Sequence, residues 1–515
     1  MLKRFLVFLI VLMLVLVPTN AIAATTRTMN VPFQAKSANG TGLQVSLVGS
    51  YGSAIFCTNL GDAATTFFQL VFYYSDSSTI ALSYNDTDPI PAGYTRSYFT
   101  PSSPAGVPSP FFGSAVVSSD QPIACNVNTQ NTGTGVGSST NPARDSTYEG
   151  VDSSQASTTL FAPQVEKVFY GWNSYIVVQN TETYPITVDI SYKDRFATAY
   201  PLADESVSIP AQSNHIFYQE NNANLPSMFL GGAKITSSGK MAAMVSFYNS
   251  GVDSSTSQFL SYTAFPSGSN KLFVPRFVRN FYGFQGGLTI QNIGETDTSA
   301  TITFTYAGNS YSYNTGTIIP GATYAVYAPN VPVLVPVDSL PVSQRTGSAI
   351  IQADPGGLIV GVINEDNRGV CSSGVAVCGA IQANWVGLGA TYEAVSDGAQ
   401  TNTVWFLQVP RHVGSADYSG GYAFANTTNN ATTCDITFPT VPAANQSGVE
   451  LAAYGSISIF APNIPNLTDG FNASVKVTCG QPILGISNFS ARNPSHLGDS
   501  FGYAIGLSRQ ETSPQ

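Results

Sequence analysis

A short segment that ends in asparagine occurs four times in this 515-residue chain. The clearest copy is Gly171–Asn180, which reads as one β-strand, and the other copies end at Asn59, Asn292 and Asn426. Successive closing asparagines are 121, 112 and 134 residues apart. A repeat of this length is too long for a solenoid unit and fits a complete domain. The sequence therefore predicts four similar domains in succession.

Alternation of apolar and polar residues predicts that each repeat is built from half-buried antiparallel strands. In the clearest copy Ile176 and Val178 share one face, while Gln179 lies on the other. Each repeat continues with a second alternating strand, a turn such as Ile319-Pro320-Gly321 and a closing hairpin. Beyond the first residues no segment has a helical period. The predicted fold class is therefore all-β, with four tandem antiparallel β-sandwich domains of about seven strands each.

Polar segments between the repeats place the domain boundaries. The predicted β-sandwich domains span residues 30–157, 158–268, 269–401 and 402–510. Within the first of them, the Gly-, Ser-, Thr- and Asn-rich stretch 131–157 is expected to be a mobile loop or linker. The closing hairpins are expected to turn at Ser238-Gly239 and Gly480-Gln481-Pro482 in the second and fourth repeats. A last strand of the third repeat is expected at Ala380 to Val386.

The N-terminal residues have the pattern of an export signal. Lys3 and Arg4 precede an apolar run of about 13 residues, and small residues around Ala23 offer a cleavage site. The run is short for a membrane span, which needs about 20 residues. We therefore predict a cleaved signal peptide at residues 1–23, with an uncleaved anchor as the alternative. The mature chain is expected to lack a transmembrane segment and to be extracellular or at the cell surface.

The composition excludes two broad classes of protein. Charged residues make up only 10% of the chain and hydrophobic residues 43%, which is enough apolar material for packed cores and argues against disorder. The formal net charge is −10 and no basic run occurs, so nucleic acid is not an expected partner.

Six cysteines fit an oxidising compartment. Only one of the 15 possible pairings keeps every bridge within its own repeat. That pairing predicts the disulfides Cys57–Cys125, Cys371–Cys378 and Cys434–Cys479. Buried free thiols are the alternative, and the close spacing of Cys371 and Cys378 also leaves open a metal site, although no histidine lies nearby.

The recurring order of asparagine-terminated strand, Ile-Pro-Gly turn and Gly-Ser-Ala hairpin resembles a known group. It is similar to the tandem immunoglobulin-like β-sandwich repeats that bacteria secrete or display on their surfaces. The resemblance covers roughly residues 30–510. It implies extracellular display or adhesion and no catalytic residues.

One segment of the chain matches a known catalytic motif. Gly498–Gly502 fits the G-x-S-x-G nucleophile elbow around Ser500, with His496 close by. The elbow requires a following helix, whereas this segment precedes a predicted strand. The other histidines, His215 and His412, have no second ligand at metal-binding spacing. We therefore expect no enzyme activity, no catalytic residue and no metal ligand.

Two acidic loops, Asn85–Asp88 and Asn364–Asn367, are candidates for calcium binding. Neither has an EF-hand pattern, so solvated turns are the preferred interpretation. No cofactor is predicted.

Two hypotheses for function follow. The first is a non-enzymatic structural or interaction protein, a rod of β-sandwiches for surface display, adhesion or self-assembly, with an extracellular protein, a glycan or another copy of itself as the partner. The alternative is an array of carbohydrate-binding modules that use exposed aromatic side chains. The candidates for such stacking are Tyr73, Tyr94, Tyr311 and Tyr313, although cross-strand packing on a sheet face is the preferred interpretation of these side chains. Trp172 and Trp405 are expected to pack between neighbouring domains.

Overall fold

The computed structural model describes residues 26–36, 49–249 and 255–508. All ladders between its strands are antiparallel, which confirms the predicted all-β class. The predicted signal peptide, residues 1–23, lies outside the described residues.

The strands fall into four successive groups, which we name units 1 to 4, and each ladder joins strands of one unit. Unit 1 contains β1 (Arg27–Lys36), β2 (Ser50–Asn59), β3 (Phe68–Tyr74), β4 (Ile80–Asn85), β5 (Thr95–Phe99), β6 (Phe111–Ser119), β7 (Ile123–Thr132), β8 (Asp145–Glu149) and β9 (Val151–Asp152). Unit 2 contains β10 (Ser157–Lys167), β11 (Trp172–Asn180), β12 (Ile186–Asp194), β13 (Glu205–Ile209), β14 (Asn214–Tyr218), β15 (Phe229–Asn249) and β16 (Phe259–Thr263).

The second half of the chain repeats this order. Unit 3 contains β17 (Lys271–Val278), β18 (Phe284–Asn292), β19 (Thr298–Tyr306), β20 (Asn309–Ile318), β21 (Thr323–Tyr327), β22 (Thr346–Ala353), β23 (Ile359–Asn367), β24 (Gly389–Glu393) and β25 (Val395–Ser396). Unit 4 contains β26 (Thr401–Arg411), β27 (Tyr418–Asn426), β28 (Thr432–Thr437), β29 (Gln446–Leu451), β30 (Ser456–Phe460), β31 (Phe471–Ala491), β32 (Gly502–Ile505) and β33 (Leu507–Ser508). Short 3-10 helices lie in the loops: η1 (Pro201–Ala203), η2 (Gln219–Asn221), η3 (Ala328–Asn330), η4 (Pro332–Ser339), η5 (Val342–Gln344), η6 (Ala383–Trp385), η7 (Pro442–Ala444) and η8 (Ala461–Asn463).

Unit 3 has two separate sheets. One has the order β20-β19-β22-β17-β25 and the other the order β21-β18-β23-β24. In units 2 and 4 the 21-residue strands β15 and β31 take part in both layers, because each first pairs with one set of strands and then with the other. The predicted turns at Ser238-Gly239 and Gly480-Gln481-Pro482 are therefore wrong, since both segments lie within continuous strands that pass between layers.

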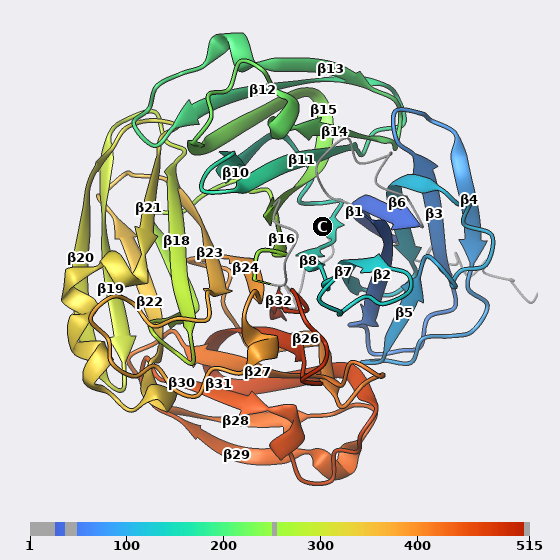
Figure 1. Cartoon of the computed structure of the whole chain (residues 1–515). Coiled ribbons are helices and arrows are strands. Elements are labelled where there is room, and N and C mark those ends of the chain that lie inside the picture. Colours follow the sequence, from blue (N-terminus) through green and yellow to red (C-terminus); the bar gives the residue numbers. More distant parts are fainter. Residues whose placement is uncertain (1–25, 37–48, 250–254, 509–515) are drawn as a thin grey trace, which may run out of the picture.

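The four units surround a common centre (Figure 1), where the strands β8, β16, β24 and β32 contact one another. Unit 4 also contacts unit 1, since the Tyr418 hydroxyl donates to the Asp145 carboxylate at 3.0 Å and the Thr95 hydroxyl donates to the Leu407 carbonyl at 3.0 Å. The units thus form a closed ring, and the expectation of an extended rod is wrong. The reason is that the central strand of each unit (β8, β16, β24 or β32) is covered by strands of other units, whereas a row of units would leave it exposed.

Two other predictions fail at this centre. Residues 131–157 were expected to form a loop or linker, but they contain the buried strand β8. The central strand of unit 3 is β24 (Gly389–Glu393), and the predicted segment Ala380 to Val386 is irregular apart from η6. Both central strands are buried by contacts with other units, and such contacts cannot be predicted from the local sequence pattern.

Carboxylates hold the central strands together across unit boundaries. Glu149 of unit 1 accepts the backbone N–H of Ile505 of unit 4 at 2.6 Å, and Glu393 of unit 3 accepts the N–H of Thr263 of unit 2. Asp499 of unit 4 accepts N–H groups from units 2 and 3, from Phe259 at 2.8 Å and from Gly389 at 2.9 Å. These bonds satisfy strand N–H groups that would otherwise be buried without a partner.

The closing asparagine performs the same task in every unit. Asn292 is fully buried; its Nδ2 donates to the carbonyls of Thr296 and Ile318, each at 2.8 Å, and its Oδ1 accepts the N–H of Gly294 at 2.9 Å. The corresponding bonds to residues two and four positions later occur in the other three units, at Asn59, Asn180 and Asn426. The asparagine therefore ends the strand and fixes the turn that follows.

The apolar cores continue across unit boundaries. The core of unit 1 includes Tyr175, Met244 and Phe259 of unit 2, and the core of unit 3 includes Ile486 and Phe501 of unit 4. Hydrophobic burial, at about 25 cal/mol per Å², therefore stabilises the ring as well as each unit.

We predict that Asn292→Ala lowers the free energy of unfolding by about 3 kcal/mol, because it removes three side-chain hydrogen bonds and leaves buried carbonyls unpaired. Urea unfolding followed by tryptophan fluorescence measures this change. The control is Asn309→Ala, since the Asn309 side chain is exposed and, among the described residues, makes a single long hydrogen bond, to the Ala307 carbonyl at 3.4 Å. Equal effects of the two substitutions would contradict the role of the buried asparagine.

The central carboxylates predict that the protein loses stability as the pH rises. Burial raises the pKa of Asp145 to about 7 and that of Glu393 to about 7, and burial followed by repulsion from Glu393 raises the pKa of Glu149. Because these folded-state pKa values exceed those of the unfolded chain, the folded state binds more protons between about pH 4 and pH 7. Stability should therefore fall through this window, by roughly 4 kcal/mol for Asp145 alone.

Urea unfolding at pH 5 and pH 8 checks this sign. Asp145→Asn should reduce the difference between the two pH values, whereas Glu450→Gln, at an exposed position, should leave it unchanged. Greater stability at pH 8 than at pH 5 in the unmodified chain would refute the prediction.

Candidate functional site

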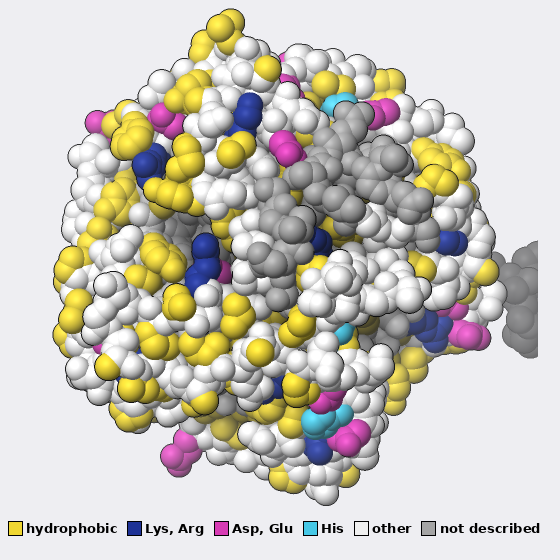
Figure 2. Space-filling model, in the orientation of Figure 1, with side chains coloured by type: hydrophobic (Ala, Val, Ile, Leu, Met, Phe, Trp, Pro, Cys, Tyr) yellow, Lys and Arg dark blue, Asp and Glu magenta, His cyan; other side chains and the backbone are white. Residues whose placement is uncertain are grey.

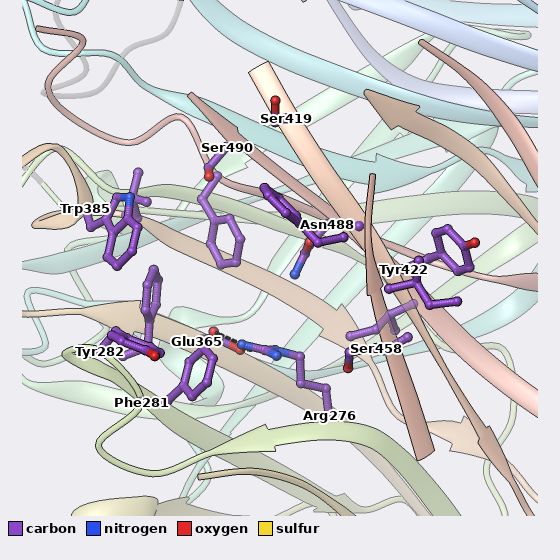
Figure 3. Close-up of a pocket in the computed structure, with 18 of the residues that line it drawn as sticks. Arg276, Phe281, Tyr282, Glu365, Trp385, Ser419, Tyr422, Ser458, Asn488 and Ser490 are labelled. Atoms are coloured by element: carbon purple, nitrogen blue, oxygen red, sulfur yellow. Dashed lines mark hydrogen bonds and ion pairs between the residues drawn. The ribbon is translucent and has the colours of Figure 1, made fainter. Parts of the chain in front are cut away.

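A pocket of about 300 Å³ lies between unit 3 and unit 4. Its wall combines aromatic rings, hydroxyl groups, one amide and two guanidinium groups, and Figure 3 shows how the labelled side chains surround it. Both units contribute, so only the assembled ring contains the complete pocket.

The floor of the pocket is a buried ion pair with a tyrosine. Arg276 on β17 binds Glu365 on β23 through two bonds of 2.9 Å, Nε to Oε2 and Nη2 to Oε1. Tyr503 on β32 of unit 4 accepts from Arg276 Nε at 2.7 Å and donates to Glu365 Oε2 at 2.5 Å. Burial opposes the charge on Arg276, but Glu365 and Tyr503 raise its pKa above the ordinary value. The arginine therefore stays charged, and its charge is balanced within the protein.

A β-bulge aims Arg276 at the pocket. The pairing of β17 with β22 shifts register between Val274 and Phe277, so Arg276 lies in the bulge. The hydroxyl of Tyr392 binds both backbone groups of Arg276: it accepts the N–H at 3.3 Å and donates to the carbonyl. Tyr148 and Tyr262 hold the corresponding bulges of units 1 and 2 in the same way.

The aromatic wall comes from the turn between β17 and β18 and from η6. The rings of Phe281 and Tyr282 meet edge to face with centroids 4.9 Å apart, and Tyr282 meets Trp385 at 6.1 Å. Asn280 and Tyr282 have φ values of 50° and 51°, which non-glycine residues rarely adopt. The loop closed by the disulfide Cys371–Cys378 supports this turn, because its Ser372 N–H donates to Asn280 Oδ1 at 2.9 Å.

Arg492, which follows β31, is the second guanidinium of the pocket. It lies over the rings of Trp385 and Phe460, with centroid distances of 5.4 and 4.8 Å. Within residues 26–36, 49–249 and 255–508 its guanidinium has neither a hydrogen bond nor a carboxylate within 4.0 Å. Burial lowers the pKa of Arg492, and the charge of Asp417 only partly offsets this effect. Arg492 is thus a half-buried cation without a bonded anion.

A related pocket of about 620 Å³ lies between unit 2 and unit 3. Its turn repeats the aromatic pair: Phe169 and Tyr170 meet at 4.9 Å, and Tyr170 has a φ of 52°. Arg195 lies over Phe169 at 5.8 Å and also lines this pocket. The sequence signal that would have found both pockets is the repeated tripeptide Phe-Tyr-Gly at residues 169–171 and 281–283, which the sequence analysis missed.

The cysteines form three disulfides, none of which contributes to the pocket wall. Cys57–Cys125 and Cys434–Cys479 join paired strands within unit 1 and unit 4, with Cα atoms 4.1 Å apart in each case. The close spacing of Cys371 and Cys378 had left a metal site open, but the disulfide between them uses both sulfur atoms. All three bridges close within a single unit.

The residues of the elbow match are structural. Ser500 is fully buried and its hydroxyl accepts the N–H of Ala491 at 3.1 Å, while the neighbouring Asp499 bonds the central strands. The following element is β32 and not a helix. His215 and His412 lie against Asp76 and Asp417, with Nδ1–Oδ1 distances of 2.6 and 2.7 Å. Burial lowers the pKa of His496.

The acidic loops considered for calcium are engaged with arginines. Glu365 binds Arg276, Asp366 binds Arg368, and Asp86 binds Arg96 at 2.6 Å. Among the described residues, no group of three or more His, Cys, Asp or Glu is arranged to hold a metal ion.

The aromatic residues singled out from the sequence have different surroundings. Trp405 packs with Leu60 of unit 1, which confirms its expected place between domains, and Trp172 lines the pocket between units 2 and 3. Tyr313 lines the same pocket and shares a 2.8 Å hydrogen bond with Tyr324. Among the other tyrosines Tyr94 is 38% exposed. Tyr73 and Tyr311 are partly buried.

Comparison with known proteins gives no family for the chain. No family model matches it, and no curated protein matches it. The crystal structure of Thermotoga maritima 1070 is similar over 25% of this chain and 96% of that one, at 14% identity and a TM-score of 0.18. The crystal structure of a tetra-tandem repeat in the extending region of a large adhesion protein is similar over 87% of this chain and 93% of its own, at 12% identity and a TM-score of 0.11.

The described residues include no helix that is both long enough and apolar enough to cross a membrane.

The buried ion pair predicts a large effect of removing one partner. Glu365→Ala should lower the free energy of unfolding by about 3–5 kcal/mol, because it leaves Arg276 charged and buried. Tyr503→Phe should cost about 2–3 kcal/mol, because it removes two hydrogen bonds, one to each member of the charged pair. Urea unfolding measures both, with the exposed Glu450→Gln as the control. A cost for Glu365→Ala no larger than that of the control would show that the pair does not hold the interface.

Proposed function

We propose that this chain is an exported, non-enzymatic binding protein, in which four tandem immunoglobulin-like units form a ring that presents ligand pockets between units. One observation carries the proposal: the pocket between units 3 and 4 places the unpaired guanidinium of Arg492 among aromatic rings and hydroxyl groups. Pockets with aromatic walls and a few placed polar groups are the usual form of a small-molecule site.

Export is supported by two independent features. Residues 1–23 have the pattern of a signal peptide, and three disulfides are typical of a chain that folds in an oxidising compartment. The partner is expected to be extracellular. Figure 2 shows few charged side chains on this face, with both signs scattered, which supports a partner other than nucleic acid.

Binding without catalysis is supported by the chemistry of the pocket. Its carboxylate, Glu365, is bound to Arg276 and Tyr503, so it is not free to act as a general base. No histidine side chain lines the pocket, and Ser419 bonds only the backbone N–H of His412, at 3.0 Å, so the serine hydroxyls of the wall have no imidazole base. The groups that remain available are hydrogen-bonding and aromatic.

Carbohydrate binding is the specific form of this function that the pocket favours. Sugars are held by aromatic faces together with amide and hydroxyl groups, and Tyr282, Asn488 and Ser458 supply these groups here. Display, adhesion or self-assembly through exposed loops is the other form, with a protein or a second copy as the partner.

Fractionation of cells that express the full chain tests the proposal. We expect the protein outside the cytoplasm, without residues 1–23 by mass spectrometry of the intact chain and without thiols that react with a maleimide. A chain that lacks residues 1–23 should remain in the cytoplasm and react at its cysteines. An unmodified chain that stays in the cytoplasm with reactive thiols would disprove export.

A further inference from the structure

We propose that the pocket between units 3 and 4 binds a sugar that carries a carboxylate, such as a uronic acid residue, and that Arg492 receives the carboxylate. The inference rests on the proposed binding function and names the ligand class of that site. It follows from the charge, the free polar groups and the size of the pocket.

The charge of the pocket favours an anion. Arg276 and Glu365 balance each other, so Arg492 leaves one uncompensated positive charge in the wall. Trp385 and Phe460 hold the guanidinium between them and restrict its motion without using its N–H groups. A guanidinium fixed in this way can donate two parallel N–H groups to one carboxylate.

The remaining polar groups suit the hydroxyls of a sugar. In the described part of the chain, the side chains of Asn488, Ser458 and Ser490 make no hydrogen bond, and all three line the pocket. Figure 3 shows the Asn488 amide directed towards the Arg276–Glu365 pair. A further lining residue, Trp385, has a buried ring N–H without a partner, which is rare unless water or a ligand supplies one.

The volume selects a small ligand. About 300 Å³ is at the lower end of the range for small-molecule sites, roughly 300–1,000 Å³, and fits one sugar unit better than an extended chain. The rest of an oligosaccharide would have to leave the pocket, so recognition is expected at one residue or at a chain end.

The related pocket between units 2 and 3 provides a contrast within the same molecule. Its arginines, Arg195 and Arg368, share the wall with the carboxylates Glu166 and Asp366. Asp366 already binds Arg368, and Glu166, whose pKa burial raises to about 7, offsets the charge of Arg195 only in part at neutral pH. The same aromatic turn is therefore combined with a wall that carries its own carboxyl groups, which should favour an anionic sugar less than the pocket of Arg492 does.

Titration calorimetry on the full mature chain tests the proposal. The probes are digalacturonic acid, the neutral disaccharide digalactose and sodium acetate, and the change in tryptophan fluorescence reports on Trp385. We expect digalacturonic acid to bind at least 10-fold more tightly than digalactose, and acetate to bind no better than digalactose. Arg492→Gln should weaken the binding of digalacturonic acid about 10-fold, whereas Arg492→Lys should retain part of it.

Arg195→Gln is the matched control, because Arg195 also lies over aromatic rings in the related pocket, and it should leave binding unchanged. Thermal unfolding of each variant separates a loss of binding from a loss of structure. Equal affinity for digalacturonic acid and digalactose, or unchanged binding in Arg492→Gln, would overturn the inference and leave carbohydrate binding in place. Binding of acetate as tight as that of digalacturonic acid would overturn the sugar requirement. Absence of binding to both disaccharides in an exported, folded protein would overturn the inference without contradicting export.

Discussion

The ring depends on an asparagine that is buried at the end of the second strand of each unit. Its amide takes the place of missing backbone partners: it binds a carbonyl four residues later, a second carbonyl near the next turn and the N–H two residues later. An apolar residue there would leave these groups buried and unpaired, at a cost of about 1–3 kcal/mol each. Because the bonds recur at Asn59, Asn180 and Asn426, the four units share one strand end and one turn geometry.

Closure of the ring needs a different device, since the four central strands come from different units and have no common ladder. Carboxylates provide it: Glu149, Glu393 and Asp499 each accept a backbone N–H from another unit. A carboxylate at a buried N–H is a strong, directional acceptor, but it is also a charge in a region with little water. The centre therefore joins the units firmly and makes that junction sensitive to protons.

The fold of this chain can be predicted from its sequence where the contacts are local. The Asn180 strand could be recognised because most of its side-chain bonds lie within 30 residues, so the pattern recurs intact in each repeat. Strand β8 could not, because Asp145–Glu149 lies in a polar stretch and owes its burial to units 2 and 4. The candidate site could not be predicted for the same reason. Arg492 and Phe460 of unit 4 lie beside Trp385 of unit 3, and residues so far apart in the sequence show no periodic pattern that links them.

Repetition and closure together explain why the pockets differ in chemistry. Each interface joins the same structural parts, so the Phe-Tyr-Gly turn appears both between units 2 and 3 and between units 3 and 4. The facing surface belongs to another unit, however, and is free to differ without disturbing the buried asparagines or the centre. Arg492 of unit 4 in one pocket and Asp366 of unit 3 in the other are such differences. A closed ring of similar units can thus vary its binding sites one interface at a time while its scaffold stays constant.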